Sequence, residues 1–393
     1  MMRYLVLVLV LVATIPVAEA DWSGDVAGEF RSFFDDPIGE RQHSDNASIS
    51  FEPEYYRDWN DRSDSLTFIP FLRWDENDDE RSHFDVRELI WTHAADEWEL
   101  RAGIGKVFWG VTESQHLVDI INQTDLVENL DGEDKLGQPM IDLTLIRDWG
   151  IVDLFLLPGF RERTFPGVEG RLRTMPHVDE SQAEFESSSE EQHIDFAARW
   201  SHTLGDWDLG VSHFHGTSRD PRFSLGADDG EPILIPIYDI IDQTGVDVQM
   251  TRGSWLWKFE GIYRSGQGVS FNAATAGFEY TFFDVHSSGI DVGVLAEYLY
   301  DDRNEDAATP FQDDLFVGSR LAFNDVQDTQ ILFGVIGDLG ADTRFWNLEA
   351  SRRFRDNWVI SIEGRLIRNP DETDPLFSLR NDDHLQLEVA YHF

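Results

Sequence analysis

Apolar and polar residues alternate along most of this chain, most clearly in its last ten residues, His384 to Phe393. A period of two predicts a β-strand with one apolar and one polar face. Ten residues is also close to the roughly 9–11 that a tilted strand needs to cross a bilayer's hydrocarbon layer. The segment therefore predicts a membrane-spanning strand, with an edge strand of a secreted sandwich as the alternative. Its apolar positions are Leu385, Leu387, Val389, Tyr391 and Phe393, and polar residues between them are Gln386, Glu388 and His392.

The same alternation recurs in eighteen segments and predicts an all-β chain, a transmembrane antiparallel up-and-down β-barrel of about 18 strands. Long polar connections, at 161–191, 216–232, 301–313 and 368–383, alternate with short turns. The even number places both chain ends on the short-turn side. The first four segments alternate less clearly, so sixteen strands is the alternative. The predicted strand centres are Phe30, Ile49, Phe68, Val86, Ala102, Leu143, Phe155, Phe196, Val211, Val248, Phe259, Phe278, Val294, Val317, Phe333, Leu348, Ile362 and Leu387.

A tryptophan follows four of the short turns at the same offset. These residues are Trp98, Trp207, Trp255 and Trp358, and each begins an alternating run. Tryptophan collects where a barrel wall passes from hydrocarbon to water, forming an aromatic girdle. Four unrelated core tryptophans, the alternative, would not share one offset. We therefore predict these four, together with Phe393, as membrane-interface aromatics.

The N-terminus predicts export. Arg3 precedes an apolar run from Tyr4 to Val12, and Ala18-Glu19-Ala20 follows as a small-residue cleavage site. This pattern is typical of a secretory signal peptide. We expect residues 1–20 to be removed and residues 21–393 to form a single outer-membrane β-barrel domain. That domain contains no run of about 18 apolar residues of the kind that a membrane helix requires.

Two stretches resemble known outer-membrane proteins. The last strand, ending Tyr391-x-Phe393, resembles the terminal signal of bacterial outer-membrane β-barrels. The segment from Asp85 to Asp125, with Lys106-x-x-Trp109-Gly110, resembles a hairpin-plus-loop of porin-like outer-membrane proteins of Gram-negative proteobacteria. The resemblance implies a bacterial outer-membrane channel for small hydrophilic solutes. Its partners would be outer-membrane lipid and lipopolysaccharide and the barrel assembly machinery, with the solute and the oligomeric state left open.

Charged residues occupy the predicted interior face of many strands, with acids and bases two positions apart. Lysine occurs at only three positions (Lys106, Lys135 and Lys258), so arginine supplies nearly all the basic groups. Arginine's planar fork suits fixed networks with carboxylates, and in a water-filled pore such networks set selectivity. The alternative is that they only neutralise one another. The predicted pore-lining residues are Arg31, Arg87, Arg101, Arg199, Lys258, Glu260, Arg264, Glu297, Arg320, Glu349, Arg353, Glu363 and Arg365.

One long connection, from Phe108 to Pro139, is unusually apolar. Because its aliphatic side chains would each forfeit roughly 1.5–3 kcal/mol of burial in water, we expect the segment to fold into the barrel and narrow it. Its acids, Asp119, Asp125, Glu128 and Asp131, are expected to face the aqueous path and to give a modest preference for cations. Its aliphatic residues are Leu117, Val118, Ile120, Ile121, Leu126, Val127 and Leu130.

The composition and motifs of the chain argue against several functional classes and kinds of site. A formal net charge of −44 argues against nucleic-acid binding, which needs a basic surface. The absence of cysteine excludes disulfides and thiolate metal sites. No hydrolase, metalloprotease or phosphate-loop motif is present, so we predict no catalytic residues and no enzyme. An outer-membrane barrel enzyme, of lipase or protease type, and a plugged structural or adhesive barrel are the alternatives to the channel.

Two further groups could hold cations. His202, His213 and His215 lie on one predicted hairpin and could bind a metal, but such residues are more often polar wall side chains, and we predict no metal site. A pairing of Asp208 with His213 would be the start of a catalytic site. Acidic loops offer hard oxygen ligands for weak Ca²⁺ or Mg²⁺ binding, with mere solubility as the alternative; these acids are Asp75, Asp78, Asp79, Glu80, Asp371, Glu372 and Asp374.

Overall fold

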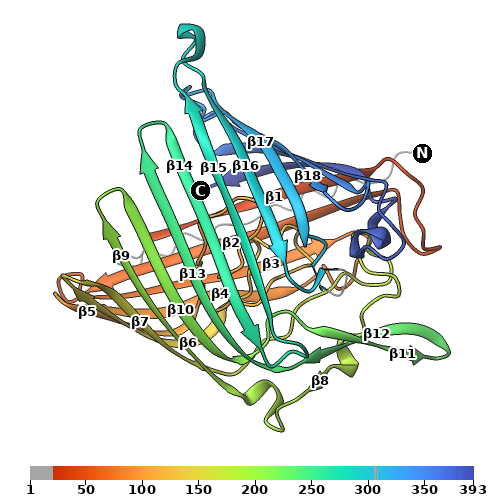
Figure 1. Cartoon of the computed structure of the whole chain (residues 1–393), viewed down its shortest axis with the longest axis horizontal. Helices are drawn as coiled ribbons and strands as arrows, with labels where there is room; N and C mark the ends of the chain where they lie inside the picture. Colours follow the sequence, from red (N-terminus) through yellow and green to blue (C-terminus); the bar gives the residue numbers. More distant parts are fainter. Residues whose placement is uncertain (1–20, 305–306, 308) are drawn as a thin grey trace.

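The computed structural model describes residues 21–304, 307 and 309–393, and the predicted signal peptide lies outside these residues. Eighteen antiparallel strands form one closed sheet (Figure 1). None of the helices in the described part of the chain is long and apolar enough to cross a membrane. The barrel strands are β1 (Asp21–Phe33), β2 (Asp45–Trp59), β3 (Asp64–Asp75), β4 (Phe84–Ala94), β5 (Trp98–Gly105), β6 (Gln138–Arg147), β7 (Gly150–Pro158), β9 (Ile194–Leu204), β10 (Trp207–Thr217), β13 (Ile240–Arg252), β14 (Trp255–Ser265), β15 (Phe271–Phe282), β16 (Asp291–Asp301), β17 (Asp313–Ala322), β18 (Gln330–Asp338), β19 (Arg344–Phe354), β20 (Trp358–Arg368) and β21 (His384–His392).

The predicted architecture is confirmed. Each predicted strand centre lies in a different barrel strand, so the described residues form eighteen barrel strands and the sixteen-stranded alternative is wrong. The barrel closes where β1 pairs with β21, in a register that sets Asp25 opposite His392 and Phe33 opposite His384. The Phe393 backbone N–H adds a bond of 3.0 Å to the Gly24 carbonyl. The last residue therefore lies at the seam, as its position after an alternating strand suggested.

Strand β14 shows how the alternation fixes the two faces of the wall. Trp257, Phe259 and Tyr263 project outward and are exposed. On the alternate positions, Glu260 and Arg264 project into the barrel and are buried there. Because successive side chains of a strand point to opposite faces, the outer surface becomes an apolar band and the interior collects the charged residues.

One predicted loop is wrong in part. In the predicted polar connection at 216–232 and just beyond it, the chain forms a hairpin of β11 (Arg222–Asp228) and β12 (Glu231–Tyr238). Asp229 and Gly230 make its two-residue turn, both with positive φ (46° and 89°), which is the preferred chemistry of tight hairpins. The hairpin pairs with β8 (Glu184–Phe185) and projects from one end of the barrel (Figure 1). The four short 3-10 helices are η1 (Glu180–Gln182), η2 (Glu190–Gln192), η3 (Val285–Ser287) and η5 (Pro375–Leu379) among the described residues.

Candidate functional site

The connection between β5 and β6, residues 106–137 and hereafter the inner loop, folds into the barrel. This confirms the predicted inward-folded loop, although Pro139 already belongs to β6. Val118 and Ile121 are fully buried, and Ile120 is 2% exposed. At roughly 1.5–3 kcal/mol per buried aliphatic side chain, this packing opposes the entropy of ordering the loop. The wall residues of the same apolar cluster include Phe155, Phe214, Ile241, Ile262 and Phe271.

Two wall carboxylates hold the tip of the inner loop through its backbone. Glu260 accepts hydrogen bonds from the N–H groups of Val111 (2.7 Å), Thr112 (3.0 Å) and Val118 (3.2 Å). Glu297 on β16 accepts from the N–H of Ser114 at 2.8 Å and from its hydroxyl at 2.6 Å. Loop N–H groups have no strand partner, so they need such acceptors when buried. Both carboxylates are buried beneath the loop, and the prediction that they line the open pore is wrong.

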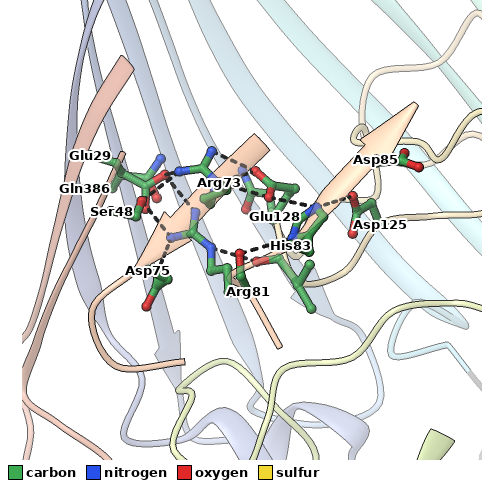
Figure 2. Close-up of polar contacts among 12 residues, drawn as sticks. Glu29, Ser48, Arg73, Asp75, Arg81, His83, Asp85, Asp125, Glu128 and Gln386 are labelled. Carbon is green, nitrogen blue, oxygen red and sulfur yellow. Dashed lines mark hydrogen bonds and ion pairs between the residues drawn. The ribbon is translucent and has the colours of Figure 1, made fainter. Parts of the chain in front are cut away.

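A second set of charges joins the inner loop to β1–β4 (Figure 2). Arg73 binds Glu128 of the loop at 2.7 Å. Arg81 and Arg31 both bind Glu29, each at 2.9 Å. All five side chains are buried in the barrel interior. A buried carboxylate needs such partners, so these arginines fasten the loop to the wall, and Arg31 is a structural group here and lines no open water path.

Two further acids of the inner loop are also bound by protein side chains. Asp125 binds Arg87 at 2.6 Å and accepts from the Thr164 hydroxyl at 2.6 Å. Asp119 binds Lys135 of the same loop at 3.1 Å. Asp119 and Asp125 therefore do not face an aqueous path, and that prediction is wrong for both. Glu128 borders a cavity described below, but Arg73 already occupies its carboxylate.

His83, Asp125 and Glu128 each place one potential ligand atom within 4.8 Å of the others, the arrangement expected of a metal site. Its charge balance disfavours a cation, because the guanidinium groups of Arg73 and Arg87 already bind the two carboxylates. Figure 2 draws His83 beside these two carboxylates. Its imidazole Nε2 lies 3.7 Å from an oxygen of each. The geometry therefore favours an ion-pair network over a metal centre.

Around the rest of the wall, most of the predicted pore residues contact a carboxylate. Lys258 (3.5 Å) and Arg320 (2.7 Å) both approach Glu113 of the inner loop, a residue that the sequence pattern did not single out. Arg353 is exposed on β19. The remaining pairs are Arg101 with Asp142 at 3.8 Å, Arg199 with Asp247 at 2.6 Å, and Arg264 with Asp220 at 3.0 Å.

Arg365 on β20 is the centre of a carboxylate cluster. Its guanidinium binds Asp131 of the inner loop at 3.0 Å, Glu349 at 3.1 Å and Glu363 at 3.4 Å. Three carboxylates thus share one arginine, and the cluster keeps a net negative charge. Of the four loop acids, Asp131 borders the wide cavity described below and Glu128 borders the narrow one.

Two cavities flank the inner loop. The wide cavity, about 620 Å³, lies between the loop tip and β17–β20, and Glu113, Asp131, Glu133, Glu349 and Glu363 border it. Arg365 is its one arginine and it has no lysine, counting the described residues. The narrow cavity, about 230 Å³, lies between the loop and β1–β4, and Glu133 borders it too. Its other charged groups are Asp25, Glu52, Glu128, Asp134 and Glu388 against Arg73, Arg87, Lys106 and Lys135.

His116 of the inner loop carries a positive charge at neutral pH. Burial alone lowers the pKa of its imidazole, but a hydrogen bond of 2.7 Å to Glu133 and the nearby Glu260 carboxylate raise it to about 10. Glu260 lies 3.9 Å away. His116 therefore offsets part of the negative charge where the two cavities meet.

The other predicted groups lie away from these cavities. Trp98, Trp207, Trp255 and Trp358 are exposed at the first residues of β5, β10, β14 and β20. His213 and His215 project outward, where both contact Asp242. Asp208 bonds to Thr203 and is not brought to His213.

Two acids expected to bind divalent cations in the loops have protein partners instead. Asp75 binds Arg81 at 2.8 Å, and Asp78 accepts from the Gly167 N–H at 3.1 Å. Both are buried. The prediction that these two belong to a diffuse surface site is wrong, because carboxylates taken out of water are used to hold neighbouring loops.

Comparison with solved structures identifies the architecture. A BenF-like porin from Pseudomonas fluorescens Pf-5 aligns over 95% of this chain and 98% of its own, with 10% sequence identity and a TM-score of 0.58. The chain has a porin-like fold. A mutant of Rh. blastica porin also aligns, over 95% of this porin-like chain and 100% of its own, at 12% identity and a TM-score of 0.47. No protein-family model matches the sequence, and no curated protein matches it significantly. At 10% identity, the similarity to the BenF-like porin establishes the fold and leaves the solute open.

Proposed function

We propose that this porin-like barrel is an outer-membrane channel through which small hydrophilic solutes diffuse, with a modest preference for cations. The observation that carries the proposal is the excess of carboxylates along the two cavities beside the inner loop. The wide cavity is bordered by five carboxylates against Arg365 and the protonated His116, and acids also outnumber bases at the narrow one. Charges at a narrow, low-dielectric passage concentrate ions of opposite sign.

The same proposal assigns the barrel its surroundings. The outward apolar band and the exposed tryptophans at the short-turn end would contact lipid and lipopolysaccharide. The barrel assembly machinery would insert the chain after export by its signal peptide. We propose no catalytic role, since Asp208 and His213 do not meet among the described residues. Cell fractionation should recover the full chain with the outer membrane, and a form lacking residues 1–20 should stay in the cytoplasm.

The test of the channel is the reversal potential in a salt gradient across a planar bilayer. The wild-type protein should conduct and favour potassium over chloride modestly. Replacing residues 109–136 by a short Gly-Ser turn should raise the conductance and weaken that preference, because the loop and its acids are removed together. A wild type that prefers chloride would show that the arginines dominate the field. A barrel that inserts but does not conduct would favour the plugged alternative.

A charge-matched control separates the cavity from the rest of the interior. Glu363→Gln removes a carboxylate that borders the wide cavity, whereas Glu279→Gln removes one from the interior face of β15 that does not. Only Glu363→Gln should reduce the cation preference. Equal effects of the two substitutions would mean that the total charge of the barrel, and not this cavity, sets its selectivity.

A further inference from the structure

The interior wall beside the wide cavity carries an apolar row where a water-filled barrel normally presents polar side chains. Phe316, Ile336, Phe345 and Ile367 lie directly opposite one another on β17, β18, β19 and β20. All four project inward, and Phe345 is the least buried of them. The row lies toward the long connections, which over the described residues add Phe311, Leu376 and Leu379 to the same cavity. The end of the wide cavity nearest the long connections is therefore apolar.

Along the same strands, small side chains and then charged side chains follow the apolar row. One register step below the apolar row lie Gly318, Gly334, Asn347 and Arg365, and the next step brings Arg320, Leu332, Glu349 and Glu363. The glycines are required by packing, since a Cβ at Gly334 would lie 2.3 Å from a ring carbon of Phe316. One cavity thus has an apolar end and, about two register steps away, an acidic end.

The acidic end can accept a cation. Arg365 already shares its guanidinium among Asp131, Glu349 and Glu363. Its fork is therefore largely occupied and offers little to an incoming anion, while three carboxylates retain free lone pairs. From the opposite side, the inner loop adds Glu113 and Glu133, whose charges are offset in part by Lys258, Arg320 and His116. An anion with an apolar body would fit the apolar end of the cavity, but the carboxylates of the acidic end would repel it.

We propose that the wide cavity selects small organic cations that carry an apolar body, such as an ammonium group on a hydrocarbon or aromatic frame. The apolar body lies against the row around Phe345, and the cationic group lies beside Glu349 and Glu363. A volume of about 620 Å³ suits such a molecule, because small-molecule pockets span about 300–1,000 Å³. This inference rests on the proposed channel function and narrows its solute class.

The experiment is reduction of potassium current through single channels by three probes of known chemistry. Benzyltrimethylammonium carries both the charge and an apolar ring, tetramethylammonium carries the charge alone, and benzenesulfonate carries the ring with the opposite charge. The benzyl cation should reduce the current at about tenfold lower concentration than tetramethylammonium, the scale of discrimination that an apolar pocket achieves. Benzenesulfonate should be the weakest of the three.

Variants locate the effect. Phe345→Ser should remove most of the advantage of the benzyl cation and leave reduction by tetramethylammonium unchanged. Ile336→Asn, in the same apolar row at the cavity wall, gives a second variant should the first fail to insert. Leu256→Ser makes a similar change on the interior face of β14, outside the cavity, and should behave as wild type. Glu349→Gln should weaken the reduction of the current by benzyltrimethylammonium and by tetramethylammonium to the same extent.

The outcomes separate this inference from the channel proposal. If the protein conducts and prefers potassium but the two cations act equally, the apolar end does not bind solutes and the inference is overturned while the channel stands. If benzenesulfonate reduces the current most strongly, the proposal that a cationic group lies at the acidic end is overturned as well. An advantage of the benzyl cation that survives both wall substitutions would place its site elsewhere and overturn the assignment to this cavity.

Discussion

Removing one charge at Glu260 should loosen the inner loop by a measurable factor. One of its oxygens, Oε1, accepts from the N–H groups of Val111 and Thr112 and from the Thr112 hydroxyl, and the other accepts from Val118 at 3.2 Å. In Glu260→Gln, the amide nitrogen can replace only one oxygen. The best orientation keeps the three bonds to Oε1 and sets an N–H donor against the Val118 N–H.

The magnitude follows from that loss. A hydrogen bond to a charged group contributes about 1.5–3 kcal/mol, so losing the bond from Val118 should favour local opening of the loop by about 10–150-fold. Amide hydrogen exchange reads such local opening directly. In the folded barrel in detergent, the amides of Val111, Thr112 and Val118 should exchange faster by that factor. Those of the strands around them should not change.

The control is again Glu279→Gln, which makes the same chemical change on β15 without touching the loop backbone. Unchanged exchange at Val111, Thr112 and Val118 in Glu260→Gln would refute the idea that this carboxylate holds the loop. An equal rise in both variants would mean that the barrel as a whole had loosened. Channel conductance should rise with loop opening in Glu260→Gln alone.

Three further predictions concern the wall, the seam and pH. Ile362→Arg places a charge on the outward face of β20 and should cost about 2–4 kcal/mol in barrel unfolding measured in lipid, whereas Ile362→Leu should be nearly neutral; a small cost for arginine would put this residue inside. Deleting Phe393 should lower the heat-modifiable, folded fraction in the outer membrane without blocking secretion, and equal insertion would remove its role at the seam. The pKa of His116, raised from 6.5 to about 10, means that its pairing with Glu133 and Glu260 stabilises the loop fully below pH 6.5 and is lost as the pH rises through 10. Conductance should therefore increase above about pH 9 in wild type, and His116→Gln should abolish that change.

The sequence alone determined the barrel. An alternation of period two decides which face of a strand is apolar, and a strand length suited to a bilayer decides that the sheet crosses one. This is why Leu387, Ile362 and Phe259 could be placed at strand centres without a structure. The pattern does not predict the hairpin of β11 and β12, although Asp229-Gly230 carries a strong turn signal, because the polar connection is expected to end at Pro232, the second residue of β12. The inward fold of the inner loop was also predictable, since its aliphatic residues need a surface to bury against.

Only the tertiary structure decided what each interior charge does. Alternation places Glu260, Glu297 and Glu363 on the same interior face, yet the first two are covered by the inner loop and the third meets open space. The partners of Asp125 and Glu128 are arginines 38 and 55 positions earlier in the chain. Periodicity fixes a face, but exposure to water depends on which distant segment covers that face. The acidic and apolar ends of the wide cavity arise in the same way, from the register of four neighbouring strands and from the loop opposite them.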